Sequence, residues 1–261
     1  MIGGAVGQPV LETHGLTIRF GGHVAVDNVS CAFHPGTLTA IVGPNGAGKT
    51  TYFNLISGQL RASSGRVSLF GEDISQLSAP QRTKRGIGRA FQLTNLFPRL
   101  TVLENVRLAV QARAGVGKDL FSVWRSHTEL VEKAEHFLHR VALAEKRDTV
   151  ASTLPHGDQR KLEVAILLAL EPDVFMFDEP TAGMSANEVP VILELIHHVK
   201  AQGDKTILLV EHKMDVVRSL ADRIVVLHQG ELVADGEPEA VIASPIVQEA
   251  YLGVATAAAH G

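Results

Sequence analysis

The chain has little cysteine, no excess of basic charge and no long uninterrupted hydrophobic run, and each absence narrows its possible function. The single cysteine, Cys31, excludes an intrachain disulfide and a zinc site built from several cysteines. A formal net charge of −4 at pH 7 is unlike a nucleic-acid-binding surface, so no nucleic-acid partner is expected. No stretch reaches the roughly 18 apolar residues that cross a bilayer, since Glu171, Pro172 and Asp173 interrupt the longest one, residues 164–177. Any role at a membrane is therefore expected to act through a partner protein.

The most informative stretch is residues 39–51, TAIVGPNGAGKTT. Residues 40–42 are typical of a buried parallel strand, the pattern GxxxxGK[ST] follows directly, and residues 51–60 are typical of a helix. Glycine lets the backbone curl so that its N–H groups face phosphate oxygens, and the helix N-terminus adds partial positive charge. Lys49 supplies a mobile positive charge for the β- and γ-phosphates, and the Thr50 hydroxyl is placed to ligate Mg²⁺. The nucleotide-binding residues predicted here are Gly43, Pro44, Asn45, Gly46, Ala47, Gly48, Lys49, Thr50 and Thr51.

Hydrophobic alternation and helical periodicity divide the chain into an α/β core and a helical insertion. Residues 10–33 alternate around a Gly21-Gly22 turn, which predicts an antiparallel β piece ahead of the phosphate loop. We predict an α/β fold of the phosphate-loop (P-loop) NTPase class, with a mixed, mainly parallel sheet. The predicted organisation is an N-terminal tail (1–9), a core (10–94 and 160–240), a helical subdomain (95–159) and a C-terminal extension (241–261).

Two apolar residues of the antiparallel piece, Phe20 and Val24, fall near the phosphate loop in this arrangement. They are candidates for a flat apolar platform beneath a nucleotide base. Packing within the core explains the same pattern equally well from the residues alone.

Four predicted strand ends carry polar side chains suited to ATP hydrolysis. Asp178 can hold Mg²⁺ directly or through water, as strand-end aspartates do in phosphate-loop enzymes. Glu179 points elsewhere and can orient, or accept a proton from, the attacking water. His212 can donate to the γ-phosphate, where negative charge collects in the transition state. The full set is Lys49 with Thr50, Gln92, Asp178 with Glu179, and His212.

At these residues the chain resembles the ATP-binding-cassette (ABC) ATPases, over about residues 10–240. Residues 43–51 are similar to the Walker A motif, and residues 174–179 to the Walker B motif with its catalytic glutamate. The resemblance implies ATP and Mg²⁺ as cofactors, stacking of Phe20 on adenine, and a Gln92 that senses the transmembrane partner. The catalytic residues it implies are Glu179, His212, Gln92 and Lys49, and the Mg²⁺ ligands are Thr50, Gln92 and Asp178.

Residues 154–158, LPHGD, occupy the place of the family signature, which usually begins LSGGQ. In the family this segment contacts the γ-phosphate of ATP held by the other subunit. The resemblance therefore extends the nucleotide site to Pro155, His156, Gly157 and Asp158. Proline lacks the serine hydroxyl and a backbone N–H, although it fits the first turn of a helix. We expect a weakened signature contact, and a weakened dimer contact at Ser185, where the family usually has aspartate.

Less specific features resemble the ATPases of branched-chain amino-acid importers. They are the sequences of residues 177–188 and 210–217 and a long insert near residues 107–130. The resemblance implies a homo- or heterodimer of ABC ATPases, docked on integral-membrane permease subunits, with a periplasmic or extracellular substrate-binding protein as an indirect partner. It implies a peripheral position on the cytoplasmic face of the inner (plasma) membrane. Related importers carry other amino acids or small amides. A lipid or lipopolysaccharide transport ATPase and a soluble, non-transport ABC ATPase stay open as alternatives.

Overall fold

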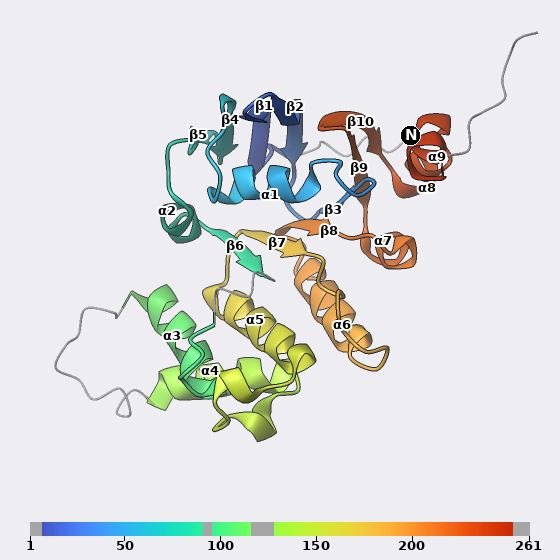
Figure 1. Ribbon diagram of the computed structural model, residues 1–261. Helices are drawn as coiled ribbons and strands as arrows, with labels where there is room; N and C mark the ends of the chain where they lie inside the picture. Colours follow the sequence, from blue (N-terminus) through green and yellow to red (C-terminus); the bar gives the residue numbers. More distant parts are fainter. Residues whose placement is uncertain (1–6, 91–95, 116–127, 253–261) are drawn as a thin grey trace, which may run out of the picture.

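The computed structural model describes residues 7–90, 96–115 and 128–252, which form two sheets and a set of helices (Figure 1). The strands are β1 (Leu11–Phe20), β2 (His23–Phe33), β3 (Leu38–Val42), β4 (Ser64–Leu69), β5 (Glu72–Asp73), β6 (Ile87–Ala90), β7 (Val174–Asp178), β8 (Thr206–Val210), β9 (Arg223–His228) and β10 (Glu231–Gly236). The helices are α1 (Lys49–Ser57), α2 (Ala79–Lys84), α3 (Val102–Ala114), α4 (Thr128–Arg140), α5 (His156–Leu170), α6 (Val189–Lys200), α7 (Met214–Leu220), α8 (Pro238–Ile242) and α9 (Pro245–Leu252), with short 3-10 turns η2 (Ala144–Lys146) and η3 (Ala151–Thr153).

The larger sheet has the strand order β10-β9-β3-β8-β7-β6. Strands β9, β3, β8, β7 and β6 pair in parallel, and β10 joins β9 antiparallel. The smaller sheet, β2-β1-β4-β5, is antiparallel. The predicted mixed sheet and N-terminal antiparallel piece are both confirmed. Because parallel strands end at one edge of a sheet, the loops after β3, β7 and β8 meet there, where open α/β sheets bind ligands.

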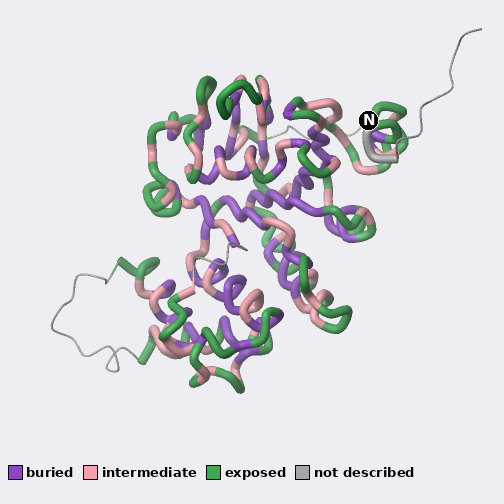
Figure 2. The backbone as a smooth tube through the Cα atoms, viewed as in Figure 1, coloured by how far each residue is buried: buried purple, intermediate pink, exposed green. Residues whose placement is uncertain are grey.

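The central strands are apolar along their length because both faces of the larger sheet are buried (Figure 2). Successive side chains point to opposite faces. Val174 and Met176 of β7 therefore join the core that contains α1 and the smaller sheet. Phe175 and Phe177 join the core formed with α3, α4, α5 and α6. Figure 1 shows the result, with α1 between the two sheets and the helical layer on the opposite face.

The boundaries of the elements show where the sequence pattern was sufficient and where it was not. The apolar runs at residues 206–210 and 223–228 form β8 and β9, and the helical pattern between them forms α7. Helix α5 begins at His156, and Pro155, which was expected in the first turn of a helix, occupies the N-cap position just before it. Strand β10 lies within the range predicted as core (160–240), α8 crosses the end of that range, and α9 lies in the predicted C-terminal extension (241–261). Gln92 lies outside the described residues.

Within the part of the chain that the structure describes, none of the helices is both long and apolar enough to span a bilayer.

Candidate nucleotide site

The phosphate loop between β3 and α1 has a backbone that requires glycine. Gly43, Gly46 and Gly48 have φ angles of 154°, 80° and 97°, in the region that residues with a side chain rarely adopt. A Cβ atom at Gly43 would collide with the backbone oxygen of Leu227, and one at Gly48 with that of Ala25. The glycines of the motif are thus needed both for the curl of the loop and for its close packing against β9 and β2.

Lys49 is the first residue of α1 and is only 5% exposed. Its Nζ donates to the backbone oxygens of Gly43, at 2.7 Å, and Pro44, at 2.9 Å. Burial lowers the pKa of Lys49, while the charges of Glu179 and Asp178 act to raise it. The phosphate loop therefore holds the Lys49 ammonium group against its own backbone. Phosphate oxygens can replace the two carbonyl oxygens as its hydrogen-bond acceptors.

A cleft of about 410 Å³ opens over this loop, bounded by the phosphate loop, the β1–β2 turn and the loops after β7 and β8. Phe20 is half exposed and lines it, as predicted for a base platform. Val24 does not line it; His23 and Ala25 do. His23 lies directly opposite Phe20 in the β1–β2 register, and directly opposite residues share a face of the sheet. Lining residues from the loop are Asn45, Gly46, Ala47, Gly48, Lys49, Thr50 and Thr51.

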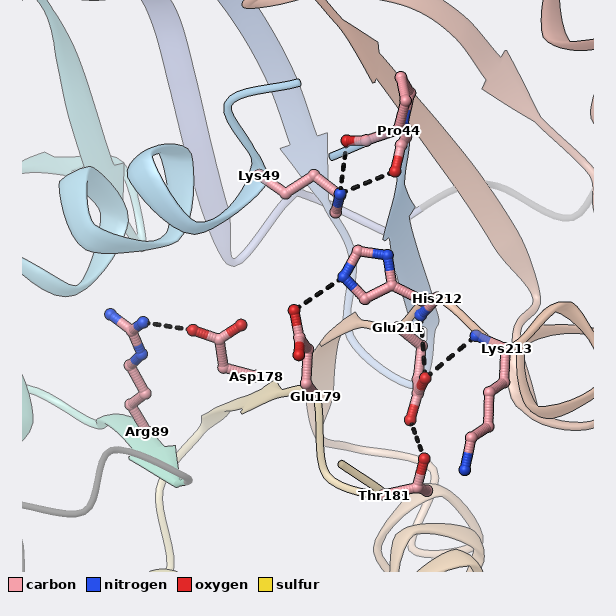
Figure 3. A network of polar contacts seen from close by, with 10 residues as sticks. Pro44, Lys49, Arg89, Asp178, Glu179, Thr181, Glu211, His212 and Lys213 are labelled. Carbon is pink, nitrogen blue, oxygen red and sulfur yellow. Dashed lines mark hydrogen bonds and ion pairs between the residues drawn. The ribbon is translucent and has the colours of Figure 1, made fainter. Parts of the chain in front are cut away.

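Glu179 and His212 face each other across the mouth of the cleft (Figure 3). Glu179 has φ of +50°, uncommon for a residue with a side chain, and its N–H donates to the Val210 oxygen at 2.9 Å. That backbone turn separates its carboxylate from the neighbouring carboxylate of Asp178. Glu179 Oε1 accepts from His212 Nε2 at 2.8 Å. The structure thus brings the predicted general base and the predicted phosphate-contacting histidine together.

Asp178 lies beside an arginine that the sequence analysis did not single out. Arg89 Nη2 on β6 donates to Asp178 Oδ2 at 2.6 Å, and the two side chains are 6% and 11% exposed. Arg89 Nη1 donates to Asn54 Oδ1 at 2.7 Å and Ser57 Oγ at 2.9 Å, both on α1. One guanidinium therefore ties β6, α1 and the end of β7 together. The only sequence signal is a charged residue in a short apolar strand.

The donors for a magnesium ion fit the way that this ion binds with nucleotides. Mg²⁺ commonly takes one or two protein ligands and completes its shell with phosphate oxygens and water. Thr50 is exposed at the start of α1, and Asp178 offers a carboxylate at the end of β7. Among the described residues there is no group of three or more histidine, cysteine, aspartate and glutamate side chains for an all-protein metal site.

The four predicted signature residues lie at the start of α5 and do not line this cleft. Asp158 pairs with Lys146 and, at 3.1 Å, with Lys161. Burial acts to raise the pKa of Asp158, but the two lysines lower it below its ordinary value. A Cβ atom at Gly157 would collide with the carboxylate of Glu188, whose Oε2 accepts from Ser185 Oγ at 2.7 Å. The signature turn is therefore engaged with charged groups of its own chain.

Fold and site together define a phosphate-loop nucleotide-binding protein of the α/β class. The family described as ABC transporter matches residues 26–182, more than half of the chain. The chain belongs to the ABC transporter family.

Relatives cover almost the whole chain. The high-affinity branched-chain amino acid transport ATP-binding protein LivG of Escherichia coli (strain K12) is 39% identical over 253 residues, which are 95% of this chain and 99% of LivG. The protein BraF of Pseudomonas aeruginosa, described in the same words, is also 39% identical, with the same coverage. A solved nucleotide-free ATP-binding cassette from an ABC transporter superposes with a TM-score of 0.79 at 30% identity, covering 93% of this chain and 98% of that one.

Proposed function

We propose that the chain is the ATP-hydrolysing subunit of an ABC importer that carries branched-chain or other amino acids, or small amides, through separate permease subunits. ATP hydrolysis is supported by the arrangement at the edge of the larger sheet. Lys49, Glu179 and His212 line one cleft there, beside Asp178. The names of the relatives favour branched-chain amino acids over a lipid cargo. A soluble, non-transport role is disfavoured by the same names.

In this proposal the phosphate loop and Lys49 bind the triphosphate, and Phe20 stacks on the adenine. Thr50 and Asp178, with Gln92 as a further ligand, would hold Mg²⁺, which would supply positive charge against the phosphates. Glu179 orients the attacking water and accepts its proton. His212 donates to the γ-phosphate as negative charge develops there. The 2.8 Å contact between His212 and Glu179 at the mouth of the cleft supports this pairing of roles.

The signature residues Pro155, His156, Gly157 and Asp158 complete the site of a second ATPase subunit, identical or homologous. ATP clamped between the phosphate loop of one subunit and the signature turn of the other draws the pair together. Hydrolysis releases this clamp and drives the permease subunits. The working position is the cytoplasmic face of the membrane, with a substrate-binding protein acting indirectly on the other side.

The test is a pull-down of tagged Glu179→Gln protein with ATP and Mg²⁺ from gently solubilised membranes, followed by mass spectrometry. Recovery of hydrophobic permease subunits supports the proposal, and recovery of a second ATPase shows that the dimer is heteromeric. A matched Lys49→Ala bait, defective in nucleotide binding, identifies the partners that depend on ATP. Recovery of ribosomal or DNA-bound partners in place of permeases would reject the transport role.

A further inference from the structure

A buried carboxylate joins the two loops that carry Glu179 and His212. Glu211 directly precedes His212 after β8, and Thr181 follows Glu179 in the loop after β7. Glu211 is 3% exposed and Thr181 is 1% exposed. Neither side chain lines the nucleotide cleft. Their burial therefore needs an explanation other than contact with ATP.

Both oxygens of Glu211 accept hydrogen bonds (Figure 3). Oε1 accepts from Thr181 Oγ1 at 2.6 Å. Oε2 accepts from the backbone N–H groups of His212, at 2.9 Å, and Lys213, at 3.2 Å. A buried carboxylate is costly unless such donors satisfy it. Glu211 accepts from the loop after β7 with one carboxylate oxygen and from the loop after β8 with the other. A neutral apolar side chain of the same size cannot make these bonds.

The contacts of Glu211 are linked to the cleft through His212 and Glu179, and the chain from Glu179 to Thr181 closes the circuit. Glu211 fixes the backbone of His212, and His212 Nε2 then meets Glu179 Oε1 at 2.8 Å. Glu179 is connected back to Thr181 through the short loop after β7. A shift of either loop would move the imidazole relative to the carboxylate, and catalytic groups lose activity when displaced by about 1 Å.

We propose that Glu211 is a positioning residue, which sets His212 against Glu179 by bonding the loop after β7 to the loop after β8. Thr181 is its partner on the opposite loop. The inference rests on the proposed hydrolysis of ATP. Neither residue touches nucleotide, so the loss of this link lowers kcat and leaves the binding of ATP unchanged.

The test compares Thr181→Val, which keeps the shape but removes the hydroxyl donor, with Thr181→Ser, which retains the hydroxyl. We expect Thr181→Val to lower kcat about tenfold, with the KM for ATP within about twofold of the parent, as is common for residues that orient a catalytic group. Thr181→Ser should stay within about twofold of the parent kcat. In single-turnover assays in a His212→Ala background, Thr181→Val should change the rate less than about twofold, because the positioned group is gone. Equal losses in both backgrounds would overturn the proposal.

A measurement without catalysis separates this proposal from the proposed function. Hydrogen exchange of the His212 and Lys213 amides should accelerate at least about tenfold in Thr181→Val, since their acceptor is displaced. Unchanged exchange rejects the link, whether or not the parent hydrolyses ATP. A parent without ATP hydrolysis rejects the proposed function alone. If Thr181→Val does not fold, Glu211→Asp, which keeps the charge but shortens its reach, should show the same fall in kcat at constant KM.

Discussion

On the phosphate-loop face, formed by Lys49, Asp178, Glu179 and His212, each polar side chain follows a buried parallel strand. On the signature turn, residues 155–158, the polar groups begin a helix and contact charged side chains of the same chain. The first face is held in place by the hydrophobic core beneath it. The second is held by ion pairs, and the carboxylate of Glu188 lies so close to Gly157 that a side chain there would collide with it.

This contrast indicates that the two faces meet ATP differently. The phosphate-loop face can accept a triphosphate by exchanging the carbonyl contacts of Lys49 for phosphate contacts. In the proposed dimer, the signature turn would meet the γ-phosphate with Asp158 already paired to lysines of its own subunit. In a dimer of identical chains both composite sites contain this altered turn, whereas a homologous partner with an ordinary signature leaves one site unaltered.

The largest expected effect lies on the phosphate-loop face. Glu179→Gln should bind ATP yet lose turnover on the order of a hundredfold or more, because an amide cannot accept the proton of the attacking water. Steady-state phosphate release and an equilibrium ATP-binding assay measure the two quantities. The matched control is Glu188→Gln, the same chemical change beside the signature turn, for which we expect a change of less than about fivefold. Equal turnover in Glu179→Gln and the parent would reject the assigned role.

The next effect concerns the binding of nucleotide to a single subunit. Lys49→Ala should raise the Kd for ATP by roughly tenfold to a hundredfold, since hydrogen bonds to charged groups contribute about 1.5–3 kcal/mol. Titration with a fluorescent ATP analogue measures it. Lys161→Ala, which removes a lysine from the signature helix, should leave the Kd of the single subunit within about twofold. A larger rise in Kd from Lys161→Ala than from Lys49→Ala would contradict the assignment of nucleotide binding to the phosphate-loop face.

A smaller effect is expected from restoring the family residue in the signature turn. Pro155→Ser adds a hydroxyl and a backbone N–H at the N-terminus of α5, so turnover of the dimer should rise roughly two- to tenfold, the value of one net hydrogen bond of about 0.5–1.5 kcal/mol. Phosphate release at saturating ATP measures it, with unchanged ATP affinity of the single subunit as the control. No change in turnover would show that the proline is not limiting.

The smallest effect is on stability, and it depends on pH. Asp158→Asn should lower the free energy of unfolding at pH 7 by about 1 kcal/mol, because the pairs with Lys146 and Lys161 are lost. The pKa of Asp158 is lowered below its model-compound value of 3.8. The pairs therefore stabilise the fold above that pH and lose their effect as pH falls below it. Urea unfolding at pH 7 and at about pH 3 should show the difference shrink, and Asp148→Asn, at a side chain that is 87% exposed, is the control.

The position of the phosphate-loop face at the edge of the sheet could be predicted because its sequence signals are local. A glycine-rich loop after an apolar strand, and carboxylates directly after another, give both residue type and position without any knowledge of pairing. The same reasoning placed Val24 in the cleft where His23 and Ala25 lie. Val24 pairs with Arg19, one position beyond the Phe20–His23 pair, so it points to the opposite face of the sheet from Phe20.

Contacts between distant segments could not be predicted in this way. Arg89 and Asp178 are 89 residues apart in sequence, and Thr181 and Glu211 are 30 apart. Only the strand order, with β7 between β6 and β8, brings each pair together. The contact of Glu188 with Gly157 likewise depends on how the loop before α6 lies against the start of α5.

The pair between Arg89 and Asp178 also affects the charge balance of the site when no metal ion is bound. A buried carboxylate that lost its only countercharge whenever magnesium departed would cost on the order of several kcal/mol. Arg89, anchored on Asn54 and Ser57, supplies a permanent countercharge from the chain itself. The charge of Asp178 is thereby balanced by the chain itself, and the stability of this edge of the sheet does not depend on a bound ion.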